Sequence, residues 1–448
     1  MRGNRTTLLL CCLAQLMTTL DSSILAVALP DLKAELGFTA ATLPWVVNAF
    51  AIPIAGLLLF SGRLSDRFGA RTILGIGVVV FTTASLGAGL APTAGLLLVG
   101  RVGQGVGAAL MATACLALLS QTFRDGPARA RAFGLWGAAS GSGGALGVIG
   151  GGIIVQALGW RWTLLVNVPI GIVLLAMLVF DIRALAPTTR PRLDLSGSAT
   201  FSVAAAALVL AIMSVSGDNP VAVLVWAIIG LAGLAAFVFI EIRVASTPLV
   251  PFVTLGRTGA WRPITAMLFL GGAMTATFYF LTLNLQLFHK FTPLATGLAF
   301  LPLSLGVFFA AATSHLLQHR FGTEKTTALG ALIMTIGLAA TWLFSGAPNP
   351  MALIVATGIF GIGLGIALAS IADGTTRLLP AALAGVASGV LTTAQQFGNS
   401  FGLAAAAITD ERAPSAYFGT GFASAAILAA LAVALLVTHV LRTKQTRP

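Results

Sequence analysis

Fourteen long apolar runs follow one another along the chain, and they constrain its fold more than any other feature. A helix needs about 20 apolar residues to cross the hydrocarbon of a bilayer. In lipid the backbone must also satisfy its own hydrogen bonds, as a helix does. The connections are too short to hold a soluble domain. The runs therefore predict an all-α polytopic membrane protein with fourteen spans, near 7–29, 43–61, 72–92, 95–120, 133–158, 162–182, 195–216, 221–241, 263–288, 296–318, 327–345, 351–371, 386–409 and 420–441.

The basic residues gather on one side of this expected topology. If the N-terminus is cytoplasmic, Arg101 lies within a span and only Lys33, Arg161, Lys290 and Arg412 lie outside, so the other twenty of the 25 are cytoplasmic. Lys and Arg are enriched in cytoplasmic loops of membrane proteins. The net charge of +12 is thus explained by topology, and we expect no nucleic-acid partner. We predict a multi-pass protein of the plasma (inner) membrane with both termini in the cytoplasm.

Nothing in the composition points to a soluble enzyme. Hydrophobic residues make up 57% of the chain and charged residues 8%, whereas soluble domains carry about a quarter charged residues. The sequence lacks the G-x4-G-K-[ST] loop that binds nucleotide phosphates, so ATP-driven transport is not expected. The three cysteines fall inside apolar runs without metal-ligand spacing. We expect no enzyme activity, no metal and no cofactor.

Two sequence patterns recur in the second half of the chain. The Arg-Phe-Gly step of the segment 61–69, after the second span, returns in the segment 314–322, after the tenth. The spacing G-x8-G-x3-G in the fifth span returns in the thirteenth. Each pattern pairs a span with the one eight later, as in transporters built from two halves. We therefore predict two six-helix bundles, residues 1–186 and 263–448, joined by two inserted helices within residues 187–262.

With these motifs the chain resembles the major facilitator superfamily, in its fourteen-span drug:proton antiporter branch. The resemblance implies the major facilitator fold and a secondary antiporter, driven by the proton gradient, that exports small lipophilic molecules such as drugs and antibiotics. It rests on five segments, which are Leu20–Pro30, Gly62–Arg71, Arg101–Gly105, Trp160–Gly171 and Gly385–Gly398.

The fifth span departs from the branch at one position. The antiporter motif has the form G-x8-G-x3-G-P-x2-G-G, and here Val148 stands in place of its proline. Without the proline ring, we expect a softer bend in this helix. The family ties this motif to antiport, so the resemblance supports the fold more firmly than the direction of transport.

Asp21 is the carboxylate that the sequence places clearly inside a span. Charges inside hydrocarbon are costly, and intramembrane acids are therefore functional candidates. Burial disfavours the ionised form of a carboxyl group and a nearby cation favours it, so Asp21 can carry a proton and Arg101 can displace it. The family also associates the fourth-span arginine with proton coupling. The structural alternative is a fixed contact of Asp21 with Arg101 or Gln104 that only holds helices together.

The residue types of the segment 62–71, after the second span, indicate a role in conformational change rather than in substrate binding. Gly62 and Gly69 allow a tight turn and close helix approach. Asp66 can hold a helix N-terminus or an arginine such as Arg129 or Arg131, and we predict that it latches the cytoplasmic side shut. The predicted gating residues, together with those of the fifth-span motif, are Gly62, Asp66, Arg67, Gly69, Arg71, Gly143, Gly147 and Gly151.

Polar and aromatic residues along several spans are candidates for a substrate cavity. With few buried charges, such a cavity favours lipophilic neutral or weakly cationic molecules. The alternative for each residue is an interhelical hydrogen bond or ordinary packing. The predicted cavity residues are Gln15, Thr18, Ser22, Asn48, Gln104, Trp136, Tyr279, Thr282, Gln395, Gln396 and Asn399.

Two other functions remain open at this stage. One is a symporter or uniporter that imports a small metabolite through the same fold. The other is a transport-inactive membrane receptor or scaffold. The expected partners of the leading interpretation are a small lipophilic molecule, protons and the lipid bilayer, and we expect the protein to be monomeric.

Overall fold

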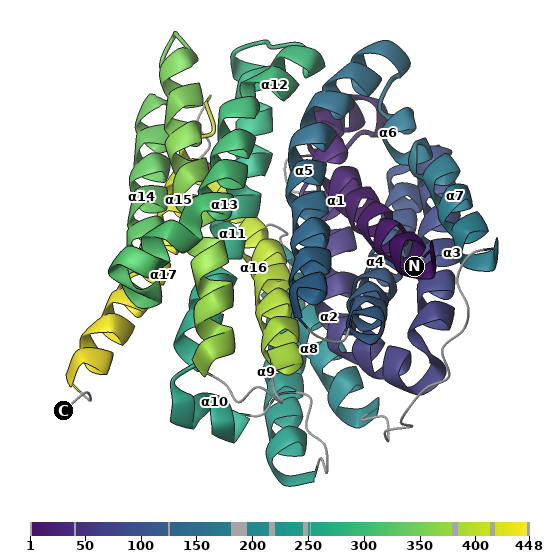
Figure 1. The fold of residues 1–448 in the computed structure, drawn as a ribbon. Coiled ribbons are helices and arrows are strands. Elements are labelled where there is room, and N and C mark those ends of the chain that lie inside the picture. Colours follow the sequence, from purple (N-terminus) through teal and green to yellow (C-terminus); the bar gives the residue numbers. More distant parts are fainter. Residues whose placement is uncertain are drawn as a thin grey trace. The chain divides into compact units, whose positions relative to one another are not determined.

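The computed structural model describes residues 2–39, 42–123, 126–180, 195–214, 220–244, 250, 252–378, 384–412 and 417–445. Every regular element within these residues is a helix (Figure 1). The elements of the first half are α1 (Arg2–Leu36), α2 (Trp45–Phe68), α3 (Ala70–Gly89), α4 (Ala94–Thr122), α5 (Gly126–Leu158), α6 (Arg161–Leu165), α7 (Asn167–Phe180) and α8 (Leu195–Met213). They are followed by α9 (Pro220–Phe239), the π-helix η2 (Ile240–Val244), α10 (Phe252–Thr258), α11 (Trp261–Leu283), the π-helix η3 (Asn284–Phe288), α12 (Pro293–Ala299), α13 (Leu301–Phe321), α14 (Thr323–Phe344), α15 (Met351–Leu378), α16 (Ala384–Arg412) and α17 (Gly419–Gln445).

The helices account for the expected apolar runs, while the number of spans stays a prediction. Among the described residues, ten helices are long and apolar enough to cross a membrane, and α2 adds an eleventh if its two parts, bent by 55°, count as one span. The expected segments 133–158, 195–216 and 386–409 coincide with α5, α8 and α16, which lie outside this count. The structure therefore shows a multi-pass helical protein, and fourteen spans remain an expectation.

The chain divides into two compact units. Unit 1 comprises residues 1–202 and 292–298, and unit 2 comprises 203–291 and 299–448. In unit 1, α1 packs along α5, α4 lies against both α2 and α3, and α3 also contacts α6 and α7. In unit 2, α11 packs along α16, α15 lies against both α13 and α14, and α14 contacts α17. Unit 2 thus repeats the helix pairing of unit 1.

Small residues allow the central helix pairs to approach closely. A Cβ added at Gly147 of α5 would lie 2.6 Å from the Cβ of Ser23 on α1, and one at Gly151 would lie 2.9 Å from the Cα of Ile24. Gly143 is equally close to Thr19. Such close backbone packing is a common way to associate helices in lipid, where no hydrophobic force drives the contact. The three glycines of the fifth span therefore join α5 to α1, and α5 continues as one helix across Val148.

Candidate functional site

The two charges that the sequence places inside spans meet in the interior of unit 1. Asp21 on α1 and Arg101 on α4 are each 1% exposed, and Nη1 of Arg101 lies 2.5 Å from Oδ2 of Asp21. An ion pair removed from water costs free energy unless its remaining polar atoms are also hydrogen-bonded. The contact that was expected between these residues is therefore present, and the site depends on what else surrounds the pair.

Arg101 has partners besides Asp21. Its Nε donates to the carbonyl oxygen of Val46 on α2 at 3.0 Å, and its guanidinium lies 4.3 Å from the centre of the Phe50 ring. A cation over an aromatic face gains more where water is excluded. Arg101 is therefore held by α2 even without the carboxylate of Asp21.

Gln104 completes the link between the two charges. Its Nε2 donates to Oδ1 of Asp21 at 2.9 Å and to Oγ of Ser85 on α3 at 2.7 Å. Its Oε1 accepts from Nη1 of Arg101 at 2.8 Å. Gln104 was predicted both as a cavity residue and as a contact of Asp21. The structure shows the contact, with the side chain fully buried.

Sequence reasoning missed two members of this network, Asn167 and Ser85. Asn167 is the first residue of α7, is fully buried, and donates from Nδ2 to Oδ1 of Asp21 at 2.6 Å. Ser85 accepts from Gln104 and donates to the carbonyl oxygen of Phe81 on its own helix. Two signals could have found Asn167, which are its amide side chain in an otherwise apolar run and its place in the segment Trp160–Gly171 that carries the family resemblance. One carboxylate thus receives hydrogen bonds from α4 and α7, and the Asp21 network consists of Asp21, Arg101, Gln104, Asn167 and Ser85.

One further carboxylate is buried among the described residues. Glu241 lies in η2, is 4% exposed, and accepts from the backbone N–H of Val250 at 3.0 Å. The sequence places it at a cytoplasmic helix end. This hydrogen bond joins Glu241 to a backbone nine residues away in the chain, whereas Asp21 is bonded to side chains of α4 and α7.

The predicted glycine roles in the segment 62–71 hold for one of its two glycines. Gly69 has φ 90° and separates α2 from α3, a backbone conformation that favours glycine. Gly62 lies inside α2, and a Cβ added there would meet no atom within 4 Å. The expectation that Gly62 provides a tight turn or a close helix contact is therefore wrong for this structure, because helix α2 continues through it to Phe68.

The charged residues of this segment differ in their surroundings. Asp66 and Arg67 are exposed at the end of α2, and Arg67 lies over the ring of Phe68. Arg71 donates from Nη2 to the carbonyl oxygen of Leu178 at 2.6 Å, so it binds the C-terminal turn of α7, where cations are favoured. The side chains of Arg129 and Arg131 lie outside the described residues, and the latch through Asp66 stays a prediction.

The predicted cavity residues of unit 1 have different environments. The hydroxyls of Thr18 and Ser22 donate to the carbonyl oxygens of Gln15 and Thr18 on their own helix. Asn48 is fully buried, and Trp136 packs against the hydrophobic core of the unit. Trp136 thus matches the packing alternative, while the bonds of Thr18 and Ser22 stay within α1, and the cavity role stays a prediction for all of them.

The predicted cavity residues of unit 2 lie on α11 and α16. Tyr279 and Thr282 are buried, and the Thr282 hydroxyl donates to the carbonyl oxygen of Phe278. Gln395, Gln396 and Asn399 are half-buried, and the amide of Asn399 lies 2.7 Å from Oε1 of Gln396. A substrate contact for these five residues stays a prediction.

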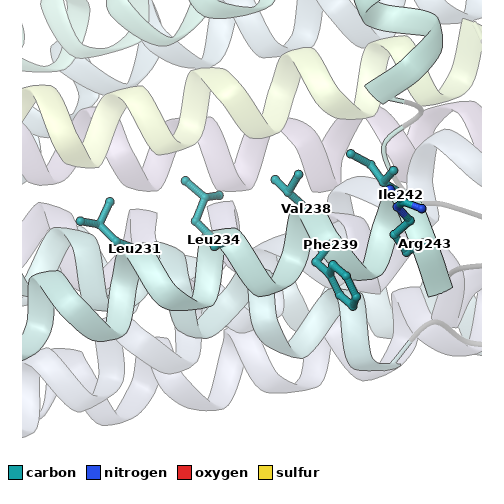
Figure 2. A pocket seen from close by; sticks show the side chains of 7 residues that line it. Leu231, Leu234, Val238, Phe239, Ile242 and Arg243 are labelled. Carbon is teal, nitrogen blue, oxygen red and sulfur yellow. The ribbon is translucent and has the colours of Figure 1, made fainter.

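A groove of about 620 Å³ runs along α9 and η2 from Leu231 to Arg243 (Figure 2). Its lining is almost entirely apolar, and none of the predicted cavity residues belongs to it. Leu224, Leu231 and Phe239 of the same helix pair are 61%, 61% and 62% exposed, as expected for a face in contact with lipid. Among the described residues no group of His, Cys, Asp or Glu could hold a metal ion.

The comparison with known families agrees with this architecture. The model of the Major Facilitator Superfamily matches residues 11–403. The chain belongs to the Major Facilitator Superfamily. It is therefore a multi-pass membrane transporter, and the resemblance seen in the sequence motifs is confirmed.

Within the superfamily, curated relatives cover most of the chain. The cephamycin export protein CmcT of Amycolatopsis lactamdurans is 38% identical over 89% of this chain and 83% of its own length. The puromycin resistance protein pur8 of Streptomyces alboniger is 35% identical over 90% of this chain and 81% of its own. The crystal structure of a D-xylose-proton symporter shares the fold, with a TM-score of 0.70 over 96% of both chains at 15% sequence identity.

Proposed function

We propose that this transporter is a proton-coupled antiporter that exports small lipophilic compounds of the antibiotic or drug type. Support for export comes from relatives at 38% and 35% identity that are named for cephamycin export and puromycin resistance. Support for a lipophilic cargo comes from the small number of buried charges among the described residues. A cavity that offers few fixed charges favours molecules that are neutral or weakly cationic.

The observation that carries the proposal is the burial of Asp21 in contact with a cation and two amides. At 1% exposure, a carboxylate can lose its charge by taking up a proton, which removes the cost of keeping that charge away from water. An inward-moving proton would neutralise Asp21 and cancel its attraction to Arg101. Loss of the proton on the cytoplasmic side would restore the pair.

Arg101 is suited to this exchange because it does not depend on Asp21 alone. When Asp21 is neutral, the guanidinium keeps the carbonyl oxygen of Val46, Oε1 of Gln104 and the ring of Phe50. A buried cation that lost every partner would cost several kcal/mol. The retained contacts lower that cost, so the pair can open and close during each cycle.

The remaining parts of the proposal follow the same family. The protein would act as a monomer in the plasma (inner) membrane, with both termini cytoplasmic and with the proton gradient in place of a cofactor. Its fourteen spans would form bundles from residues 1–186 and 263–448, with two inserted helices in 187–262. Asp66, Arg67, Arg71 and the fifth-span glycines would serve the movement of the bundles, and the predicted polar residues of α1, α11 and α16 would face the substrate.

Proton release from everted vesicles tests the proposal. An acid-inside gradient is imposed, lipophilic antibiotics and dyes are added, and the collapse of the gradient is followed by fluorescence. We expect some compounds to collapse the gradient with the wild type and none to do so with Asp21→Asn. Asp31→Asn, the same substitution at the far end of α1 and outside the Asp21 network, is the matched control and should behave as the wild type.

Other outcomes would change the assignment. Collapse with both the wild type and Asp21→Asn would keep antiport and move the proton to another residue. Protons that move in the same direction as the substrate would show a symporter. A wild type that never moves protons, with any compound, would favour the receptor or scaffold.

A further inference from the structure

The two amides that donate to Asp21 differ in how they are held. Gln104 uses both of its roles, because its nitrogen donates to Asp21 and Ser85 and its oxygen accepts from Arg101. Asn167 donates to Asp21 through Nδ2, while its Oδ1 is buried and has no hydrogen-bond partner among the described residues. A buried acceptor without a partner carries the cost of losing its hydrogen bonds to water. The unpaired oxygen of Asn167 therefore needs an explanation, whereas the oxygen of Gln104 has a partner.

The chemistry of Asp21 supplies that explanation. An ionised carboxylate can only accept hydrogen bonds, whereas a protonated one has an O–H that must donate. Of the neighbours of Asp21, Arg101 has no acceptor and the oxygen of Gln104 already accepts from Arg101. Among the groups bonded to Asp21, the oxygen of Asn167 is the acceptor that holds no hydrogen bond to another described residue. A half-turn of the Asn167 amide would present this oxygen to the new O–H.

We propose that Asn167 is the proton-responsive partner of Asp21, donating to the carboxylate when Asp21 is ionised and accepting from the carboxyl O–H when it is protonated. The proposal rests on the proposed function, since it assumes that Asp21 takes up a proton. Asn167 acts through Asp21 and is a positioning residue. It satisfies both forms of the carboxyl group inside the protein, so neither form needs water to enter the site.

Other charged groups do not replace Asn167 in this role. From α4, Arg101 faces Asp21 and stays cationic throughout. On α6, Arg161 is paired with Glu35. The sequence of α7 contains no titratable residue, and the titratable residues of α5 are Arg129 and Arg131 near its beginning. The hydrogen-bond change at Asn167 is therefore set by the proton on Asp21.

Infrared difference spectra between acidic and neutral pH, recorded on the purified full-length protein in lipid, test this proposal. A carboxylic C=O band that disappears in Asp21→Asn belongs to Asp21. We expect this band to move to higher frequency in Asn167→Leu, which has neither donor nor acceptor. It should stay close to the wild-type position in Asn167→Ser, whose hydroxyl can do both. An Asp21 band at the same frequency in the wild type and in Asn167→Leu would overturn the proposal.

The pH dependence of transport is a second test, because a purely structural role of Asn167 would not change it in the way expected here. The pH of half-maximal efflux should shift in Asn167→Leu and return toward the wild-type value in Asn167→Ser. Equal pH profiles for the two variants would also overturn the proposal. If no band disappears in Asp21→Asn, Asp21 does not titrate and the proposed function fails instead.

A measurement without substitution at Asn167 covers the case in which the Leu variant does not fold. Asparagine labelled with ¹³C at the side-chain carbonyl is incorporated into the wild type and into Asp21→Asn. We expect a labelled amide band that changes between acidic and neutral pH in the wild type and not in Asp21→Asn. The absence of such a change in the wild type would overturn the proposal.

Discussion

The two repeats of this transporter share their packing and differ in their chemistry. In unit 1, Gly105 faces the carbonyl oxygen of Phe50, and in unit 2, Gly361 faces that of Leu303. Gly107 likewise lies against Gly77 and Phe81, and Gly363 lies against Gly330 and Met334. Residue numbers thus differ by 256 between α4 and α15 and by 253 between α3 and α14. The same contact geometry therefore occurs twice.

This correspondence locates the positions in unit 2 that match four residues of the Asp21 network, which are Asp21, Arg101, Gln104 and Ser85. Gly147 faces Leu20 as Gly402 faces Gly272, so Asp21 corresponds to Ala273. The other matches, by the same offsets, are Arg101 with Thr357, Gln104 with Phe360 and Ser85 with Leu338. All four residues in unit 2 are buried, and the hydroxyl of Thr357 donates to its own helix at Ile354. The shared helix packing thus forms without a charge at these positions, and the ionisable pair is a feature of unit 1.

Introducing the acid into the second repeat should have the largest effect. Ala273→Asp would bury a carboxyl group at the position that matches Asp21, where Thr357, Phe360 and Leu338 stand at the positions of Arg101, Gln104 and Ser85. Asp at the centre of a membrane helix costs about 3 kcal/mol. We expect a clear fall in the thermal unfolding temperature of the purified protein. Ala273→Asn is the neutral control of similar size, and equal stability of the two variants would show that unit 2 also provides a polar environment.

Changing the cation of the first repeat should have the next largest effect. Arg101→Lys keeps the charge but loses the planar group that contacts Asp21, Gln104 and Val46 together. Loss of one hydrogen bond to a charged group costs about 1.5–3 kcal/mol. We therefore expect the rate of proton-coupled efflux to fall at least about tenfold. Thr357→Ser at the matching position should leave the rate unchanged, and an equal loss in both variants would contradict the assignment to unit 1.

The glycine contacts should give the smallest effect, and it should occur in both repeats. A Cβ at Gly402 would overlap the Cα of Gly272, a backbone atom, whereas one at Gly147 would first meet the side chain of Ser23. Overpacking costs about 1–3 kcal/mol and alanine regains about 1 kcal/mol in a helix. We expect Gly402→Ala to lower the unfolding temperature more than Gly147→Ala. The reverse order would show that α1 and α5 are the more tightly packed pair.

The sequence predicted the helices and three of the five residues of the Asp21 network, for identifiable reasons. Long apolar runs and the pairing of repeated motifs are local patterns, so the helices and the matching of α1 with α11 could be predicted. A charge inside an apolar run also stands out, as Asp21 and Arg101 do. Asn167 and Ser85 do not, because a neutral side chain is common in membrane helices and the partner of Asn167 lies 146 residues away. Gly62 misled the prediction because its motif resembles a turn while the helix continues.

The seam between α1 and α5 has a mechanical consequence. Thr19, Ser23 and Ile24 of α1 lie against Gly143, Gly147 and Gly151 over successive turns, beside Asp21. With Val148 in place of proline, α5 runs through this stretch as one unbroken helix. If protonation of Asp21 displaces α1, the close contact of the two helices would pass that displacement to α5. The binding of one proton would then move a helix about 50 Å long, at 1.5 Å for each of the 33 residues of α5.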